Sequence, residues 1–212
     1  MASVPLSFGF YAILTNPVVG YERLAAICAD HAIAFIQLRM KDASARDVER
    51  IGRAVKKCID GSASRFIIND YPEVARDIGA DGVHLGQNDM PYAQARAIVG
   101  PGAIVGLSTH SPDQTAAACS LQPDYIGIGP VFPTPTKKIP DPPIGIDGMK
   151  RMLATASVPA VVLGAITLEA LPEILKNGAR NFAMVRPINQ SDEPEKVLNQ
   201  ILKIYDDVKS VP

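Results

Sequence analysis

The 212-residue sequence has no tryptophan and only three cysteines. Cys28, Cys58 and Cys119 are odd in number, far apart and form no Cys-x-x-Cys pair. This pattern indicates neither a disulfide framework nor a zinc knuckle, and it favours a reducing compartment. Because all three lie in helix-like segments, we expect them to be small buried apolar residues rather than reactive thiols.

The sequence also has no large excess of basic or acidic residues and no long apolar run. Twenty-one basic residues stand against 22 acidic ones, which gives a net charge of −1. The basic excess typical of nucleic-acid or membrane-surface proteins is therefore absent. No run approaches the ~18 apolar residues of a membrane span, and residues 1–7 lack the start of a secretory signal. We expect a cytoplasmic protein with no nucleic-acid or membrane partner.

Short apolar runs alternate with amphipathic stretches along the whole chain. With a hydrophobic content of 47%, this pattern predicts a folded α/β protein. We expect eight strand–helix pairs, and Ser44 is a candidate N-cap. The expected strands are residues 8–15, 35–40, 65–69, 82–85, 103–108, 125–132, 160–163 and 182–185. The expected helices are residues 21–32, 44–59, 72–78, 91–99, 112–121, 146–156, 168–177 and 194–208.

Several of these strands are continuously apolar, as in Ala160-Val-Val-Leu, rather than alternating. Strands buried on both faces have this pattern, which is typical of a parallel sheet covered by helices. Eight such units with short connections predict a single-domain (β/α)8 TIM barrel over residues 1–212. The one long irregular segment, residues 133–145, is rich in Pro and Lys and is expected to be a functional loop.

In a barrel of this kind the active site lies at the carboxyl ends of the strands. Gln37, Arg39 and Lys41 alternate at the end of the second strand, so they share one face. If that face points into the mouth, it brings two cations into a partly dry site. The other interpretation is a salt-bridged face that points outward.

Asp70 and Asp89 directly follow the third and fourth strands. Two carboxylates that converge beside Arg and Lys are typical of a Mg²⁺ site that bridges to phosphate oxygens. Each carboxylate could instead be the N-cap of the helix that follows it. Taken together with the nearby cations, the pair favours metal binding.

Hydroxyl groups and a third cation follow the fifth and sixth strands. Ser108, Thr134 and Thr136 suit phosphate oxygens, and Lys137 adds a positive charge. Pro135 makes the Thr-Pro-Thr segment rigid, which is compatible with a ligand clamp. The three histidines, His31, His84 and His110, show no metal-ligand spacing, and we interpret them as structural.

Four blocks of the sequence resemble the thiamine phosphate synthase family, also called thiamine-phosphate pyrophosphorylase. They are QLRMKD (37–42), FIINDYPEVARDIGADGVHLGQNDMP (66–91), GLSTH (106–110) and DYIGIGPVFPTPTKK (124–138). The resemblance implies a TIM barrel that joins hydroxymethylpyrimidine diphosphate to hydroxyethylthiazole phosphate and releases pyrophosphate. It also implies dissociative chemistry, in which pyrophosphate leaves first and Mg²⁺ stabilises the leaving group.

The resemblance also assigns roles to individual residues. It implies that Asp70 and Asp89 bind Mg²⁺, and that Arg39, Lys41, Ser108 and Lys137 are the catalytic residues. The pyrimidine diphosphate would contact Gln37, Leu38, Arg39, Met40, Lys41, Asn69, Ser108 and Lys137. The thiazole phosphate would contact Thr134, Pro135 and Thr136.

The sequence departs from the family after the seventh and eighth strands. Family members have Gly-Gly-Ile and a Ser there, whereas this chain has Gly164-Ala165-Ile166 and Val185-Arg186-Pro187. We expect Gly164, Ala165, Val185 and Arg186 to complete the thiazole-phosphate site, with Arg186 offsetting the lost contacts. Arg186 could instead point outward or pair with Asp192.

These altered loops leave two other functions open, a related thiazole tautomerase and a non-catalytic binding protein for a phosphate ester. The retained cations and carboxylates argue against the tautomerase, which has no diphosphate to hold. A homodimer formed through an exposed apolar helix face is also left open.

Overall fold

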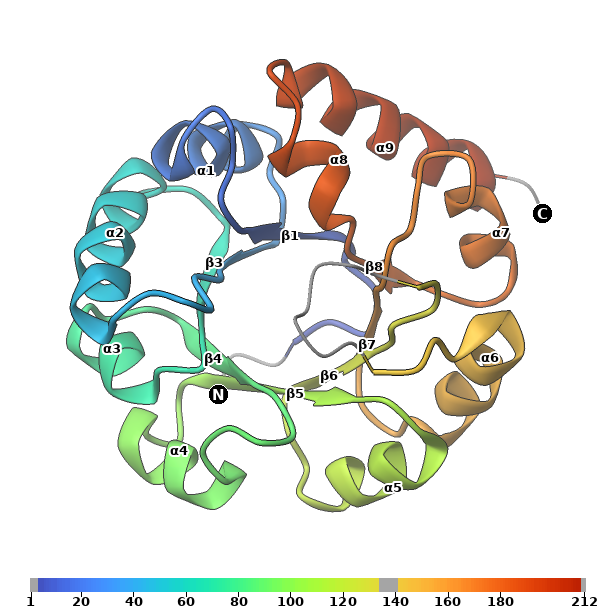
Figure 1. The fold of residues 1–212 in the computed structure, drawn as a ribbon, viewed down its shortest axis with the longest axis horizontal. Coiled ribbons are helices and arrows are strands. Elements are labelled where there is room, and N and C mark those ends of the chain that lie inside the picture. Colours follow the sequence, from blue (N-terminus) through green and yellow to red (C-terminus); the bar gives the residue numbers. More distant parts are fainter. Residues whose placement is uncertain (1–3, 134–140, 211–212) are drawn as a thin grey trace.

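Eight parallel strands form a closed barrel, and helices surround it as an outer ring (Figure 1). The computed structural model describes residues 4–133 and 141–210. Each strand pairs with the next along the chain, and β8 pairs with β1 to close the barrel. This confirms the TIM barrel that the apolar runs predicted.

The strands are short, and their ends agree with the sequence pattern best in the first half of the chain. Residues 65–69 and 82–85 form strands with the expected bounds, whereas the sixth and eighth strands end earlier than expected. The strands are β1 (Gly9–Leu14), β2 (Phe35–Leu38), β3 (Arg65–Asn69), β4 (Gly82–Leu85), β5 (Ile104–Thr109), β6 (Tyr125–Ile128), β7 (Ala160–Val162) and β8 (Asn181–Phe182).

The helices follow the expected order, with one addition after β8. Val185, expected at the end of the eighth strand, instead begins a short helix. Ser44 caps its helix as expected, because its hydroxyl accepts from the Asp47 N–H at 3.2 Å. The helices are α1 (Tyr21–Asp30), α2 (Ala45–Cys58), α3 (Pro72–Asp77), α4 (Tyr92–Val99), α5 (Pro112–Ser120), α6 (Gly145–Thr155), α7 (Leu171–Lys176), α8 (Val185–Asn189) and α9 (Pro194–Lys209).

The strands bury both of their faces, which explains why the sequence shows apolar runs rather than alternation. Along β1, Tyr11 and Ile13 point into the barrel, while Phe10, Ala12 and Leu14 pack against the helices. The interior has an aromatic floor in which the rings of Tyr11, Phe35 and Tyr125 have centroids 5.6 to 6.2 Å apart. Inward positions nearer the carboxyl ends of the strands are therefore left for the site.

Two asparagine side chains complete the seam where β8 meets β1. The Asn181 amide accepts from the N–H groups of Phe8 and Gly9 and donates to Leu6 and Ala160 carbonyls. The amide of Asn189 in α8 accepts from Thr15 N–H and donates to the Ile13 carbonyl. Since β8 has only two residues, these amides supply pairing that a longer strand would provide through its backbone.

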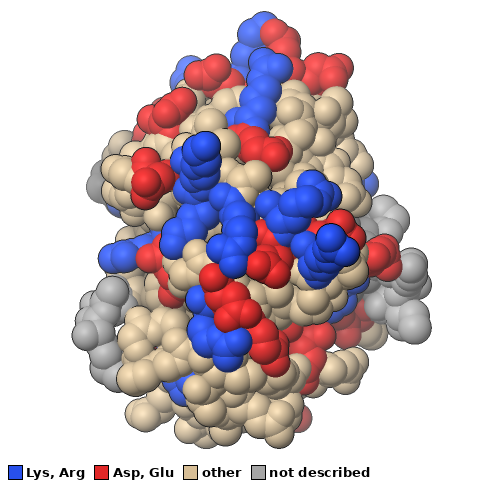
Figure 2. Space-filling model, turned by 90° about the vertical axis from the view of Figure 1, so that its left-hand side faces the viewer, with Lys and Arg blue, Asp and Glu red and all other residues tan. Residues whose placement is uncertain are grey.

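Charges of both signs are interleaved on the face that α2 and α3 cover (Figure 2). Arg53 pairs with Glu49 one turn away at 2.8 Å, and Arg76 pairs with Asp77 at 2.7 Å. Cys28 and Cys119 are buried as expected, but Cys58 at the end of α2 is exposed because the helix turns that position to solvent. Among the described residues, no helix has the length and apolar character needed to cross a membrane.

Candidate active site at the carboxyl ends of the strands

Two adjoining cavities lie at the carboxyl ends of the strands. The inner one, inside the barrel, has a volume of about 140 Å³, and the outer one at the mouth has about 1080 Å³. The inner cavity lies between apolar side chains such as Ile13, Val161 and Leu163. Six residues line both cavities, so the two form one continuous space: Arg39, Asn69, Ser108, His110, Val185 and Arg186.

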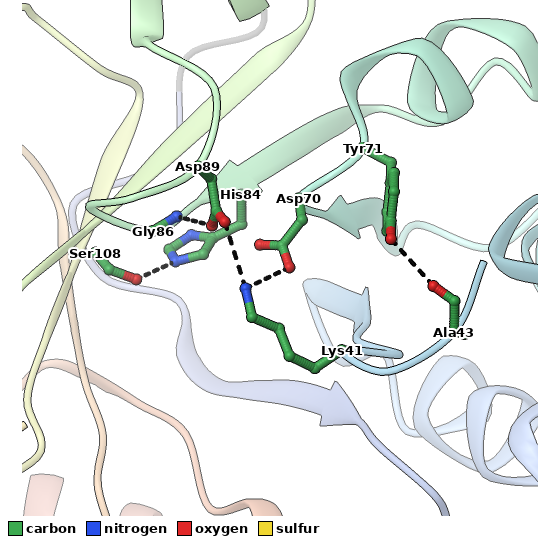
Figure 3. A network of polar contacts seen from close by, with 8 residues as sticks. All are labelled: Lys41, Ala43, Asp70, Tyr71, His84, Gly86, Asp89 and Ser108. Atoms are coloured by element: carbon green, nitrogen blue, oxygen red, sulfur yellow. Dashed lines mark hydrogen bonds and ion pairs between the residues drawn. The ribbon is translucent and has the colours of Figure 1, made fainter. Parts of the chain in front are cut away.

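One ammonium and two carboxylates meet in the outer cavity (Figure 3). The Lys41 Nζ atom lies 2.7 Å from Asp70 Oδ2 and 3.4 Å from Asp89 Oδ1. Lys41 follows β2, Asp70 follows β3 and Asp89 lies in the turn after β4, so three consecutive strands bring these charges together. The side chain of Lys41 is 49% exposed, which leaves its ammonium room to move.

Neither carboxylate caps a helix, contrary to the other interpretation that the sequence allowed. The first residues of α3 and α4 receive no side-chain cap, because the capping positions are Tyr71 and Pro91. Asp89 Oδ2 instead accepts from Gly86 N–H at 2.7 Å. Asp70 has a φ of +69°, a strained conformation that is uncommon for a residue with a side chain and that concentrates at functional sites. Both carboxylates are thus held toward the mouth.

The two carboxylates titrate differently because their surroundings differ. Burial, together with the neighbouring Asp89, raises the pKa of Asp70 to about 6. Burial also acts on Asp89, but hydrogen bonds with Asp70 and Gly86 N–H and the charge of Lys41 together lower its pKa. A cation between the carboxylates therefore stabilises the ionised form of both.

The donors at this point suit a hard divalent cation. Asp70 and Asp89 already converge on one positive charge, the Lys41 ammonium, which stands where a metal ion would neutralise the same oxygens. Carboxylate oxygens are the ligands that Mg²⁺ takes, usually one or two per site with phosphate oxygens completing the set. Within the described ranges, no cluster of three or more His, Cys, Asp or Glu could hold a metal ion, so an ion held by Asp70 and Asp89 would need further ligands from a substrate or water.

A chain of hydrogen bonds runs from the barrel interior to the mouth. Gln37 Nε2 donates to Tyr11 Oη at 3.2 Å, and Tyr11 Oη lies 2.7 Å from Tyr125 Oη. Tyr125 Oη lies 3.0 Å from His84 Nδ1, and His84 Nε2 lies 2.9 Å from Ser108 Oγ. The last of these contacts is drawn in Figure 3.

Three members of this chain were not among the site residues expected from the sequence: Tyr11, Tyr125 and His84. His84 was interpreted as structural, yet it lines the inner cavity. The strand period of two contained a signal, because His84 pairs in register with Asn69 and therefore lies beside it on the inner face. His110 also lines both cavities, where its Nε2 lies 3.4 Å from Asp141 Oδ2, while His31, the C-cap residue of α1, lines neither cavity.

The turn after β7 keeps a two-glycine conformation with only one glycine. Gly164 has a φ of +115°, and a Cβ atom there would lie 2.3 Å from Pro130 Cα. Ala165 has a φ of +50°, which lies in the left-handed region that a residue with a Cβ adopts at a cost. Position 164 thus requires glycine, whereas position 165 tolerates alanine, so the turn survives the departure noted in the sequence.

Arg186 lies in α8 and lines both cavities. It is half-buried and makes no ion pair with Asp192 or with any other residue in the described ranges. Arg186 is therefore one of the residues that line the mouth of the barrel, and the pairing with Asp192 that the sequence left open is not observed.

The remaining expected site residues divide between the cavities. Gln37, Gly164 and Ala165 line the inner cavity, and Met40 lines the outer one with Lys41, Asp70 and Asp89. The side chain of Leu38 is buried between the barrel and the helices, and this residue lines neither cavity. Thr134, Pro135, Thr136 and Lys137 lie outside the described residues.

Comparison with known proteins finds relatives that share the whole barrel. The family model described as thiamine monophosphate synthase matches residues 11–188. A thiamine-phosphate synthase of Vibrio parahaemolyticus is 39% identical over 174 residues, which cover 82% of this chain and 85% of that protein. One of Clostridium botulinum is 32% identical over 200 residues, covering 93% and 98%. The structure of thiamine phosphate pyrophosphorylase from Pyrococcus furiosus matches with a TM-score of 0.83 at 29% identity, over 95% of this chain and 96% of that one.

Proposed function

Because the chain belongs to the thiamine monophosphate synthase family, we propose that it is a transferase that makes thiamine phosphate. Its substrates are hydroxymethylpyrimidine diphosphate and hydroxyethylthiazole phosphate. The C–O bond to the diphosphate breaks, and the thiazole nitrogen forms a bond to the same carbon, which releases pyrophosphate. The observation that carries the proposal is the cluster of Lys41, Asp70 and Asp89 beside Arg39 at the mouth of an apolar cavity.

The residues at the mouth suit a reaction whose main demand is charge. A leaving diphosphate gains negative charge, and Arg39 and Lys41 line the cavity in which its oxygens would lie. Because Lys41 is half-exposed and flexible, its ammonium can move from the carboxylates to a diphosphate oxygen. We assign Ser108 and Lys137 to the same substrate on the basis of the family resemblance.

Asp70 and Asp89 would hold the Mg²⁺ of this reaction. Their convergence on the Lys41 ammonium supports this assignment, because a site built for one cation needs little rearrangement to accept another. When bound, Mg²⁺ would neutralise the charge that develops on the leaving diphosphate. Asp70 and Asp89 would thus hold the ion, while Arg39 lines the same cavity and would contact the diphosphate.

The inner cavity would receive the organic parts of the two substrates. Its walls include apolar side chains such as Ile13, Val161 and Leu163, which would limit the access of water to a pyrimidine-methyl cation before the thiazole nitrogen reaches it. Gly164, Ala165, Val185 and Arg186 line this cavity on the side opposite the carboxylates and would hold the thiazole phosphate. Arg186 offers two parallel hydrogen bonds to a phosphate group.

The two other functions are less well supported. A thiazole tautomerase has no diphosphate for the charges of the outer cavity to hold, and the relatives that match over most of this chain are synthases rather than binding proteins. A cytoplasmic location is part of the proposal, and the three free cysteines fit a reducing compartment.

A turnover assay tests the proposal directly. Purified protein is given both substrates with Mg²⁺, and both products are measured. We expect thiamine phosphate and pyrophosphate to form in equal amounts. Omitting the thiazole phosphate is the matched control, since the bond-forming step then has no acceptor. If calorimetry detects binding of the pyrimidine diphosphate but no product forms, the chain is a binding protein and the proposal is wrong.

A further inference from the structure

The hydrogen-bond chain inside the barrel has a direction that its proton donors determine. Gln37 approaches Tyr11 Oη with its amide nitrogen, so that oxygen accepts a hydrogen bond. The single hydroxyl proton of Tyr11 is then directed to Tyr125 Oη, 2.7 Å away. The proton of Tyr125 in turn points to His84 Nδ1, which must accept it.

The opposite order would leave a buried donor without an acceptor. If His84 Nδ1 carried a proton, Tyr125 would accept from it and donate to Tyr11. Tyr11 Oη would then receive protons from both Tyr125 and Gln37, and its own proton would point into the aromatic floor. An unmatched buried donor is costly, so this order is disfavoured.

The direction has a consequence at the mouth. A neutral imidazole that accepts at Nδ1 carries its proton on Nε2 and donates it to Ser108 Oγ, 2.9 Å away. Since the serine oxygen accepts this bond, its own hydroxyl proton is left to point elsewhere. Ser108 lines both cavities, so that proton is available to a ligand there.

The neighbouring strand leaves space for the ring of Tyr125. Tyr125 pairs in register with Gly106 on β5, and a Cβ atom at Gly106 would lie 2.2 Å from Tyr125 Cζ. The absence of a side chain at Gly106 thus lets the Tyr125 ring lie across the neighbouring strand. Burial raises the pKa of Tyr11 and of Tyr125, so both hydroxyls stay protonated and act as donors rather than as proton carriers.

We propose that Tyr125, acting through His84, is a positioning residue that turns the Ser108 hydroxyl proton toward the cavity. Ser108 then meets its ligand as a hydrogen-bond donor, which suits an anionic oxygen and not an ammonium or amide N–H. The ligand is identified as the diphosphate only through the function proposed above. The order of protons from Gln37 to Ser108 stands independently of that function.

The first experiment observes His84 directly in the protein without substrates. In a sample with ¹⁵N-labelled histidine, long-range proton–nitrogen spectra distinguish a protonated ring nitrogen from an unprotonated one. We expect an unprotonated Nδ1 and a protonated Nε2, with His84 assigned by its absence in His84→Gln. A protonated Nδ1 in the wild-type protein would overturn the proposal, whatever the substrates are.

Two matched variants test the direction of the chain. Tyr125→Phe removes the donor to His84, so the Nδ1 signal should shift and the second tautomer should appear. Tyr11→Phe removes a buried hydroxyl of the same kind but leaves the Tyr125–His84 bond, so the tautomer should stay as in the wild type. Equal spectra for the two variants would contradict the proposal. If Tyr125→Phe fails to fold, the wild-type tautomer still decides the question.

A double-mutant cycle shows whether Tyr125 acts through Ser108. In the wild-type background we expect Tyr125→Phe to lower kcat/KM about tenfold, a typical scale for coupled neighbours. In a Ser108→Ala background the same substitution should have almost no further effect, because the group that it positions is gone. Additive losses would assign Tyr125 a merely structural role and overturn the proposal. A wild-type protein that does not turn over at all would refute the proposed function instead, and the spectra would still test the proton order.

Discussion

The two sides of the barrel mouth hold their functional groups in different ways. Beside β2, β3 and β4, the Lys41 ammonium contacts both Asp70 and Asp89, so the three groups share their charge contacts. Beside β7 and β8, a backbone turn at Gly164 and Ala165 faces the cavity together with one guanidinium, that of Arg186. A change on the first side disturbs three groups at once, whereas residues on the second side can change one at a time. Ala165 and Arg186, which depart from the family pattern, both lie on the second side. This agrees with the expectation that residues there can change one at a time.

The largest expected effect comes from breaking the charge cluster. Asp70→Asn and Asp89→Asn should each lower kcat by roughly a hundredfold or more, because a bridging metal supplies several kcal/mol to the transition state. Asp77→Asn on the exposed face of α3 is the matched control and should be neutral. Circular dichroism checks that the variants fold. Full wild-type turnover in excess EDTA would refute the metal assignment.

Arg186 provides the corresponding test on the second side. Arg186→Ala should raise the KM for the thiazole phosphate about ten- to a hundredfold, since a charged hydrogen bond contributes roughly 1.5–3 kcal/mol. The KM for the pyrimidine diphosphate should change much less, and Arg180→Ala, at an exposed position, should change neither value. The idea that Arg186 offsets the lost contacts fails if Arg186→Ser improves the thiazole-phosphate KM.

The raised pKa of Asp70, about 6, predicts how the first side responds to acid. A carboxylate must lose its proton before it binds a cation, so Mg²⁺ affinity should fall about tenfold between pH 7 and pH 5. Titration calorimetry at a series of pH values measures this, with Asp70→Asn as the reference. An affinity that stays constant over this range would contradict the assignment.

The raised pKa of Asp70 also predicts that acid stabilises the fold of the metal-free protein, although acid weakens the binding of Mg²⁺. The pKa of Asp70 lies above its ordinary value of 3.8, so the folded state holds this proton more tightly than the unfolded state does. Its contribution to stability is complete below about pH 4 and is lost as the pH rises through about 6. Denaturant titrations of the wild type and Asp70→Asn should therefore differ in their pH dependence within this window.

The smallest expected effects come from the turn after β7. Gly164→Ala should lower the free energy of unfolding by roughly 1–3 kcal/mol, because φ is +115° and the new Cβ would lie 2.3 Å from Pro130 Cα. Ala165→Gly should raise it by less than about 1 kcal/mol, since it relieves a left-handed alanine but adds freedom to the unfolded chain. Urea midpoints measure both changes. Changes of the same sign would contradict the different roles of the two positions.

The fold was predictable where local pattern and burial agree. The ends of β3 and β4 follow directly from apolar runs that stop at polar residues, and Ser44 caps α2 by its own local chemistry. The end of β8 was not predictable, because Ala183 and Met184 continue the apolar run although the chain has already left the strand. Their burial comes from the turn into α8, which a run of apolar letters does not distinguish from a strand.

The candidate site shows the same division. Arg39, Lys41, Asp70 and Asp89 could be found because each lies at the end of a predicted strand, where side chains converge whatever the details of packing. The contacts that join Tyr11, Tyr125 and His84 could not be found, although the strand period places His84 on the inner face, since they cross the barrel at sequence separations of 114 and 41 residues. Which inward side chains meet there depends on the register of every strand between them.

The seam between β1 and β8 has a consequence for the order in which the barrel is completed during synthesis. The first strand leaves the ribosome early, but its partners on one side, Asn181 and Asn189, are made more than 170 residues later. Until then, β1 and β7 each present an open edge, the kind of surface that pairs with other chains. A chain that stops before Asn181 keeps both edges open, so such a truncated chain should yield aggregates rather than a shortened barrel.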